Sequence, residues 1–446
     1  MMNPSDSRRA PDIMQRIRLR LESRLGLLVL IGVGVVISCY SLVHVALYQP
    51  YLLYDADRLA YALVAVTAFS IVSLLFVFVP FSFGYFIGFN LFSMVLGFIW
   101  LNCFSKLNYD HRLAGLSAAV SALLFLLPAL LINAPAKPAF ALTPRGFQHL
   151  LNLILLLALG TIVAASFYNF RLVSISRIYD FRNQLHFPVP IGHLIGIVST
   201  ALLPFAFASY LALSRRWLAG LTLLLMLLFY PITLSKFAFF STGWMIAVLI
   251  LSRAFEPRAA VILSVILPIL AGAILIVALP HRYSLPYFDL VNIRMMATPS
   301  IALEVYNDFF AGHAKTWFCQ ISFLKPLMNC PYQEPLSVVM EKAYKLGNFN
   351  ASLFATEGVA SVGLYFAPLA ALLCGLIVAI GNRTSARLPA RFVLISSALL
   401  PSTFLNVPFA TALLTHGAAF LFLLWYVTPR AMFEPDVEPA PSSDLT

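Results

Sequence analysis

The sequence predicts an all-α polytopic membrane protein with about twelve transmembrane helices. Of its 446 residues, 61% are hydrophobic and only 11% are charged, whereas soluble domains are about half apolar and about one quarter charged. The apolar residues fall into separate runs of about twenty, the length that an α-helix needs to cross a bilayer. The net charge of +11 comes from basic clusters between those runs. It therefore indicates membrane topology rather than nucleic-acid binding.

The apolar runs define the spans in order. Arginines from Arg8 to Arg24 precede the first run and place the N-terminus in the cytoplasm by the positive-inside rule. This run is too long for a signal-peptide core, so we expect it to remain as an anchor. Residues 431–446 are expected to form a disordered cytoplasmic tail. The expected spans are about 25–48, 59–79, 85–104, 113–132, 150–168, 190–214, 217–235, 237–252, 259–280, 358–380, 392–407 and 409–427.

The longest polar segment, residues 281–357, follows the ninth span and is expected to be a periplasmic loop. A polar loop of this length in an apolar chain is where binding and catalytic residues concentrate. Thr298 can cap a helix, Pro299 suits its first position, and Gly312 can end it. The sequence therefore predicts a partly helical loop with a free helix N-terminus near Thr298.

Arg294 lies just ahead of that predicted N-terminus. Unpaired N–H groups and a guanidinium fork together favour a phosphate or pyrophosphate. The alternative is structural: Arg294 pairs with Glu304 or Asp308, which lie four residues apart on one helix face, and holds the loop in place.

A second basic cluster surrounds Tyr179 and Asp180, with Arg177 and Arg182 on either side. It can bind a second phosphate group, or it can form an interfacial belt at the lipid headgroups. Lys236, at the end of a span, adds a further cation, with membrane snorkelling as the alternative.

We expect the polar loop to bind a phosphorylated lipid-linked sugar. Transfer of the sugar from a lipid pyrophosphate requires a base for the acceptor hydroxyl and cations for the departing pyrophosphate. The sequence does not separate the candidate bases, and a structural role remains open for each. They are Asp308, Glu304, His313, Glu357 and Asp180.

Asp55 and Asp57 have the spacing of a metal-binding carboxylate pair, but Arg58 beside them offers an ion pair instead. The chain has no glycine-rich phosphate loop, zinc-type cluster or nucleophile elbow. We therefore expect no metal site and no cofactor.

Of the five cysteines, Cys39, Cys103 and Cys374 fall inside apolar runs and are expected to be buried hydrophobic residues. Cys319 and Cys330 share the polar loop. Because that loop is expected to face an oxidising compartment, we predict a disulfide between them.

Several motifs in the second half of the chain resemble the bacterial O-antigen or oligosaccharide repeat-unit polymerases (Wzy-type). The 179–182 cluster and the Ser235-Lys236 turn resemble two shorter features of that family. The main motifs are Arg294-Met-Met-Ala-Thr-Pro299, Tyr306-Asn-Asp308-Phe-Phe310 and Asn348-Phe-Asn350-Ala-Ser-Leu-Phe-Ala-Thr-Glu357-Gly358.

This resemblance implies a glycosyltransferase C-like fold in the bacterial inner membrane, without a metal. The substrate would be an oligosaccharide on undecaprenyl pyrophosphate, and a flippase and a chain-length regulator would be partners. Arg294, Arg177 and Arg182 would hold pyrophosphates, with Lys236 as a further cation. The sugar-side or catalytic groups would be Asp308, Glu357, Asn350 and Tyr306; the family pattern favours Asp at the position of Glu357.

Three alternatives remain open. An O-antigen ligase would share the fold and lipid donor, but would contain a stronger histidine element than His313 alone. A metal-dependent sugar transferase would depend on Asp55 and Asp57. A transporter or flippase of anionic glycolipids would place ionisable residues within the spans.

Overall fold

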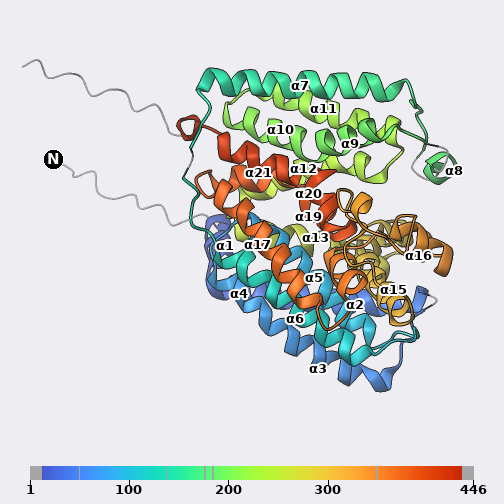
Figure 1. Ribbon diagram of the computed structural model, residues 1–446. Helices are drawn as coiled ribbons and strands as arrows, with labels where there is room; N and C mark the ends of the chain where they lie inside the picture. The colour runs from blue at the N-terminus through green and yellow to red at the C-terminus, as the bar shows by residue number, and fades with distance from the viewer. Residues whose placement is uncertain are drawn as a thin grey trace, which may run out of the picture. The chain divides into compact units, whose positions relative to one another are not determined.

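The computed structural model describes residues 13–49, 51–137, 139–174, 177–182, 185–347 and 350–433. Within these ranges the chain is helical, and the only β contact is an isolated bridge between Leu52 and Ser105. Figure 1 shows the helices along the chain. Of the tail predicted at 431–446, residues 434–446 lie outside the described residues, whereas Met432 ends the short helix η8 (Arg430–Met432).

The described residues contain ten helices that are long and apolar enough to cross a membrane, which confirms the polytopic membrane class. Nine of them overlap the first nine predicted spans, and the tenth begins later than expected, at Ala367. They are Arg24–Ala46, Ala56–Phe78, Phe83–Asn102, His111–Leu131, Pro144–Ser166, Val189–Ala212, Arg216–Thr233, Lys236–Ala254, Pro257–Ala278 and Ala367–Ser385.

The last two predicted spans are broken into short helices, so twelve continuous spans are not found in the described chain. They are α18 (Ala390–Ser396), α19 (Leu400–Asn406), α20 (Phe409–Leu414) and α21 (Ala418–Val427). Pro408 interrupts this stretch because it cannot donate a helical hydrogen bond. Gly417 adopts a φ of +81° immediately before α21, a conformation that glycine reaches without steric cost.

The remaining helical elements complete the chain. Two of the membrane-length helices contain changes of helical type within them. The elements are α1 (Ile13–Glu22), α2 (Arg24–Tyr48), η1 (Ala56–Arg58), α3 (Leu59–Ser70), η2 (Ile71–Ser73), α4 (Leu74–Phe78), α5 (Phe83–Asn102), α6 (His111–Leu131), α7 (Pro144–Ser166), α8 (Ile178–Arg182), α9 (Val189–Ile197), η4 (Val198–Leu202), α10 (Leu203–Ala212), α11 (Arg216–Thr233), α12 (Lys236–Ala254), α13 (Pro257–Ala278), α14 (His281–Phe288), η5 (Asp289–Ala297), α15 (Thr298–Gly312), η6 (Lys325–Leu327), α16 (Leu336–Tyr344), η7 (Phe354–Ala360), α17 (Ala367–Ser385) and η8 (Arg430–Met432).

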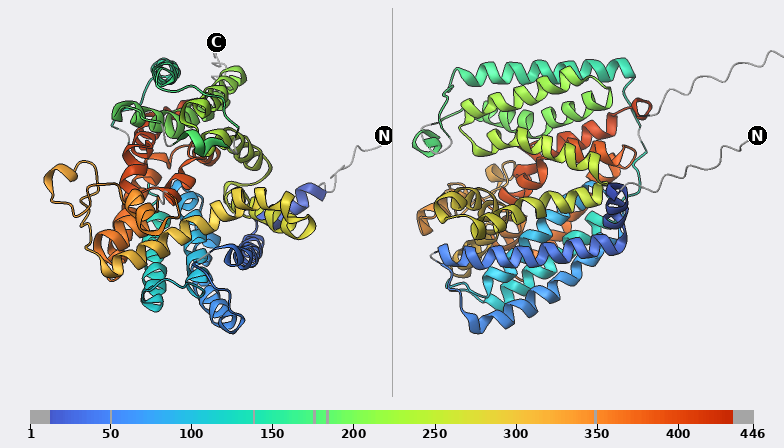
Figure 2. Two further views of the ribbon diagram at one scale, coloured as in Figure 1. Left: turned by 90° about the vertical axis from the view of Figure 1, so that its right-hand side faces the viewer. Right: turned by 180° about the vertical axis from the view of Figure 1, so that it is seen from behind.

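The chain divides into two compact units that interleave along the sequence. Unit 1 comprises Met1–Leu131, Ala247–Leu376 and Phe404–Phe409. Unit 2 comprises Ile132–Ile246, Ile377–Thr403 and Ala410–Thr446. The blue and orange segments of unit 1 can be followed in both views of Figure 2.

Helix α5 is the core of unit 1. Along the most apolar 18-residue stretch of α5, 94% of the residues are buried. Along the corresponding stretch of the span Arg24–Ala46, only 33% are buried. Aromatic side chains fill the space beside it: the rings of Phe76 and Tyr85 are 5.2 Å apart, and the Tyr85 hydroxyl donates to the Phe76 carbonyl at 3.1 Å. Because α5 is enclosed while α2 exposes apolar residues, α2 is a lipid-facing helix and α5 is not.

Helices α14, η5 and α15 form one continuous helical segment, which we call the crossing segment (His281–Gly312). The Tyr287 hydroxyl donates to the carbonyl of Pro268 in α13, and Ser300 donates to the carbonyl of Met94 in α5 at 2.9 Å. The segment thus passes from α13 to α5 and brings α15 against the core of unit 1.

Wide π-helical turns in two helices end shortly before a proline. Segment η5 ends at Ala297 before Pro299, and η4 ends at Leu202 before Pro204. Proline has no N–H to donate and its ring collides with the carbonyl four residues back in an α-helix. A wider turn relieves that collision and lets the helix continue.

In unit 2, α10 is buried among α7, α11 and α18. Trp244 and Trp425 tie other helices of the unit together, donating to the Ala398 carbonyl at 2.9 Å and to the Ser396 hydroxyl at 3.0 Å. Helix α7 keeps one apolar face exposed, with Leu156 66% exposed.

We predict that Gly272→Ala destabilises unit 1 by roughly 1–3 kcal/mol. A Cβ at Gly272 would lie 1.7 Å from Oδ1 of Asn292. It would displace the Asn292 amide, which donates to Ser41 and to the Ile269 carbonyl, both at 2.9 Å. The measurement is the apparent unfolding temperature in detergent. Gly32→Ala is the control, since a Cβ there meets nothing within 4 Å; equal effects of the two substitutions would contradict the packing role.

Candidate functional site

Two carboxylates on α15 have contrasting surroundings. Glu304 is fully buried, and its carboxylate oxygens make no hydrogen bond of standard geometry, although the Ser105 hydroxyl is close enough to affect its pKa. Asp308, one turn later, is only partly buried. Since a buried ionised carboxylate without a partner is very costly, Glu304 is expected to carry a proton.

Burial raises the pKa of Glu304 to about 8. The Ser105 hydroxyl, in the connection between α5 and α6, opposes this rise in the pKa of Glu304, and the charge of Glu304 acts on Cys103 and Tyr109 in the same connection. Burial raises the pKa of the Tyr109 hydroxyl well above its ordinary value, and the charge of Glu304 raises it further. Burial and the charge of Glu304 therefore both favour the neutral Tyr109 hydroxyl.

We predict that Glu304 makes the protein less stable as the pH rises from about 4.5 to about 8. In that window the unfolded carboxyl has released its proton while the folded one retains it, so unfolding becomes progressively easier. Glu304→Gln should remove this part of the pH dependence and unfold at a higher temperature than the wild type at pH 8. The apparent unfolding temperature measured between pH 5 and pH 9 tests it.

Glu341→Gln is the matched control because Glu341 is exposed on α16. It should retain the wild-type pH profile. Parallel profiles for Glu304→Gln and the wild type would show that Glu304 does not bind this proton.

Asp308 joins three segments of unit 1. Its Oδ1 accepts a hydrogen bond from the Asn108 N–H at 2.6 Å, and its Oδ2 accepts one from the Tyr344 hydroxyl. The Tyr344 carbonyl in turn accepts from the Tyr51 hydroxyl at 3.1 Å. Burial raises the pKa of Tyr344, and its hydrogen bond to Asp308 adds to the shift. The two donors hold the Asp308 carboxylate between the α5–α6 connection and α16.

The connection between α5 and α6 is held on its other side by a polar cluster. The Asn102 side chain accepts from the Tyr109 hydroxyl at 3.0 Å and donates to the His111 carbonyl at 2.9 Å. The rings of Tyr109 and His111 are 4.2 Å apart. This cluster fixes the backbone that presents Asn108 to Asp308.

Glu357 and Tyr306 are buried where η7 packs against α15. Glu357 is 7% exposed and accepts a hydrogen bond from Thr356, while Tyr306 is 1% exposed. Tyr306 therefore lies beneath the surface of the folded chain. Asn350, the other residue assigned to sugar binding, is exposed.

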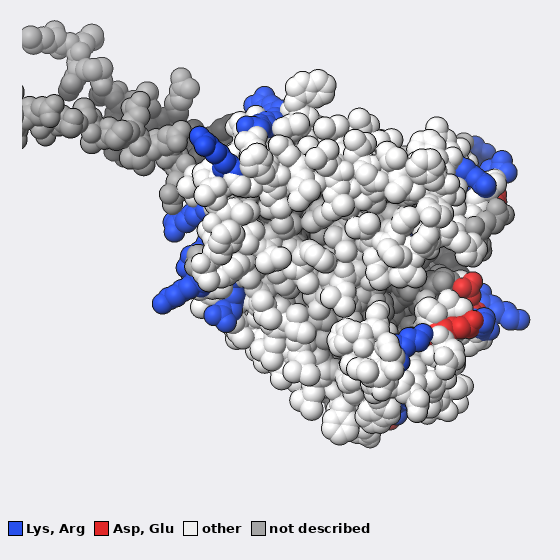
Figure 3. Space-filling view, turned by 45° about the horizontal axis from the view of Figure 1, so that its top comes forward, with Lys and Arg blue, Asp and Glu red and all other residues white. Residues whose placement is uncertain are grey.

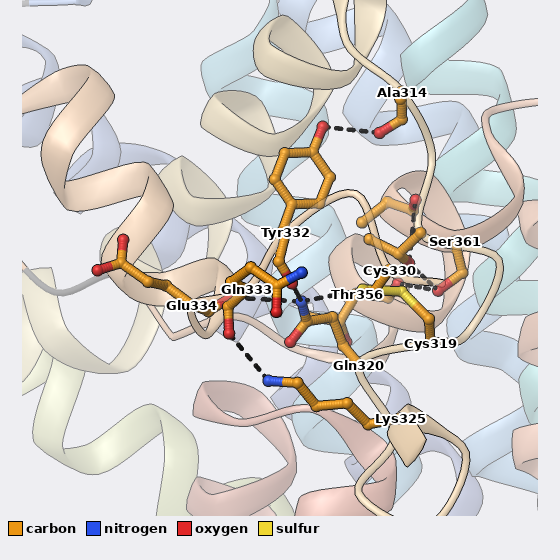
Figure 4. The surroundings of a disulfide bond; sticks show 12 residues. Ala314, Cys319, Gln320, Lys325, Cys330, Tyr332, Gln333, Glu334, Thr356 and Ser361 are labelled. Carbon is orange, nitrogen blue, oxygen red and sulfur yellow. Dashed lines mark hydrogen bonds between the residues drawn. A yellow bond between two sulfur atoms is a disulfide. The ribbon is translucent and has the colours of Figure 1, made fainter. Parts of the chain in front are cut away.

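The predicted disulfide between Cys319 and Cys330 is present, with Cα atoms 5.4 Å apart (Figure 4). Gln320 lies beside it and donates to the Tyr332 carbonyl at 2.9 Å. Lys325 donates to the Gln333 carbonyl at 2.9 Å. The disulfide and these contacts give the loop after α15 a defined conformation.

His313 follows the end of α15, where Gly312 ends the helix as predicted. Its ring stacks on Phe309 with centroids 3.9 Å apart, and its Nδ1 lies 2.7 Å from the Phe309 carbonyl. One ring nitrogen is thus engaged by the backbone, although the side chain is exposed.

The predicted helix N-terminus at Thr298 is wrong. The residue before it, Ala297, is already helical, because η5 continues directly into α15. The N–H groups at Thr298 therefore lie inside a helix and do not form an anion site. Arg294 is exposed on η5. Glu304 does not pair with it, because neither Glu304 oxygen makes a hydrogen bond of standard geometry.

The other predicted cations belong to unit 2. Arg177 lies 3.5 Å from Asp180, and its guanidinium lies over the Phe181 ring. The side chain of Arg182 lies outside the described part of the chain. Lys236 is half-buried at the first residue of α12.

Asp55 and Arg58 form an ion pair at 3.6 Å, and Asp55 also accepts from the Asp57 N–H at 3.0 Å. These contacts favour the structural interpretation of this pair. Among the described residues, no group of three or more His, Cys, Asp or Glu side chains is arranged to hold a metal ion.

Sequence reasoning did not identify Asn108 or Tyr344 as partners of Asp308. Neither stands in a recognisable motif, and both are brought to Asp308 only by folding.

Comparison of the chain with known proteins found no matching family model, no similar curated protein and no similar solved structure.

Proposed function

We propose that this protein is a membrane glycosyltransferase that polymerises oligosaccharide repeat units carried on undecaprenyl pyrophosphate, at the periplasmic face of the bacterial inner membrane. The observation that supports it best is the carboxylate pair on α15, in which Asp308 is held by a tyrosine and a backbone N–H. Two of the stretches that resemble the repeat-unit polymerases lie in α15 and η7, and these two helical segments pack against each other.

Asp308 is the candidate general base. In the transfer, an acceptor sugar hydroxyl attacks the anomeric carbon of the donor, and the bond from that carbon to the pyrophosphate oxygen breaks. The hydroxyl proton passes to the base and the undecaprenyl pyrophosphate departs with the bonding electrons. A general base at this position would contribute about 10²–10⁴ in rate.

The disulfide loop supports the periplasmic orientation of this site, because disulfides persist in oxidising compartments. Arg294 supports pyrophosphate binding by its exposure and its guanidinium fork alone, since the helix N-terminus proposed beside it is absent.

We predict that purified protein supplied with lipid-linked repeat units produces a ladder of longer glycans, and that Arg294→Ala abolishes the ladder without loss of folded protein. Arg282→Ala is the control: Arg282 is also exposed on the crossing segment and stacks on Tyr283 at 4.4 Å. A full ladder from Arg294→Ala would eliminate Arg294 as a pyrophosphate ligand. Transfer to a lipid A core in place of a ladder would identify a ligase.

We predict that Asp308→Asn lowers the rate of chain extension by about 10²-fold or more, whereas Tyr344→Phe lowers it less than about tenfold. The phenylalanine removes one hydrogen bond and leaves the carboxylate in place. Initial rates of glycan extension for both variants provide the test. Equal losses would mean that Asp308 acts only by holding Asn108 and Tyr344 together.

A second candidate function is transport of an anionic glycolipid. It is favoured by the buried Glu304 carboxyl, because unpartnered ionisable groups in membrane proteins often bind coupling protons. Movement of a fluorescent lipid-linked sugar across proteoliposomes without chain extension would support it.

A further inference from the structure

An open apolar groove of about 810 Å³ runs along the exposed face of α7 in unit 2. Leu156, Gly160 and Val163 of α7 line it, together with Ile191 of α9. The groove owes part of its depth to Gly160, where a Cβ would meet nothing within 4 Å.

The groove ends at Phe167 and Tyr168, next to a basic connection. Tyrosines mark the level of the lipid headgroups in many membrane proteins. The Tyr168 ring packs edge-on against the Phe187 ring, with the two ring centroids 6.3 Å apart. The backbone N–H of Arg171, three residues further on, donates to the Pro231 carbonyl at 2.9 Å. This bond anchors the connection to the end of α11.

The charges at this end suit one singly charged headgroup. The guanidinium groups of Arg171 and Arg177 both lie over the Phe181 ring, each 5.8 Å from the ring centroid. Arg177 is paired with Asp180, whereas among the described residues Arg171 has no carboxylate within 4.0 Å. Arg171 therefore offers a guanidinium to a phosphate without first breaking an ion pair.

The length of the groove matches one leaflet. A helix rises about 16 Å from Leu156 to Phe167, and half of a bilayer hydrocarbon core is about 15 Å. On the face seen in Figure 3, the blue lysine and arginine atoms lie toward the edges, with red acidic atoms among them on the right, and the broad surface between is white. A ligand of this groove thus has a chain one leaflet long and an anionic head beside Arg171.

We propose that the α7 groove binds one anionic phospholipid of the surrounding bilayer, with an acyl chain over Gly160 and the phosphate at Arg171. The site does not use Asp308 or Arg294, the two residues of unit 1 on which the proposed transfer reaction depends. Its single phosphodiester and short chain distinguish this ligand from a long polyprenyl pyrophosphate.

The test is native mass spectrometry of delipidated, purified full-length protein with palmitoyl-oleoyl phosphatidylglycerol or phosphatidylcholine. The wild type should retain one phosphatidylglycerol in preference to phosphatidylcholine. Gly160→Leu and Ala164→Leu fill the same face one turn apart and should each weaken retention about tenfold, equivalent to about 1.4 kcal/mol.

The controls come from the same unit. Gly220 in α11 is also exposed, and a Cβ there meets nothing within 4 Å, so Gly220→Leu should bind as the wild type does. Arg171→Ala should remove the preference for phosphatidylglycerol, whereas Arg216→Ala, at the other end of α11, should keep it.

Three results would overturn the proposal. They are unchanged retention by both groove-filling variants, equal retention of the two phospholipids by the wild type, and displacement of phosphatidylglycerol by equimolar polyprenyl phosphate. The last would assign the groove to a lipid carrier instead. Glycan extension does not enter this measurement, so failure of the polymerase proposal would leave its outcome unaffected.

Discussion

The contact between Gly272 and Asn292 determines where the crossing segment lies in unit 1. Only a residue without a side chain admits the asparagine amide so close to α13, and the amide then bonds to α13 and α2 together. Small residues permit such close helix approach in membranes, where hydrophobic burial alone gives little preference between packings. From this anchor the segment continues to α5 and places Glu304 and Asp308 at the end of the unit's core.

Much of the membrane architecture could be predicted because long apolar runs have few alternatives in a bilayer. The nine runs before residue 281 all correspond to long apolar helices. The stretch 390–427 misled the same reasoning, because its mean composition is apolar while proline, glycine and buried serines interrupt the helix. Composition over a window reports hydrophobicity, whereas helix continuity depends on single residues.

The helix start predicted at Thr298 failed for a related reason. Threonine followed by proline is a good capping sequence, but proline is also tolerated inside a helix when the turns before it widen. Whether residues 289–297 are helical depends on their packing against α13, α2 and α5, which no local pattern contains. The pair Glu304 and Asp308 could be placed on one helix, but the partners of Asp308 lie 200 and 36 residues away in sequence.

The contrast between the two carboxylates follows from how far α15 carries each of them. One turn places Glu304 against the end of α5 without a hydrogen bond of standard geometry, and the next places Asp308 beside two donors. Two negative charges one helical turn apart would repel each other. Keeping Glu304 protonated removes that repulsion. A base on this helix is therefore better placed at Asp308 than at Glu304, because Asp308 is only partly buried whereas Glu304 is fully buried.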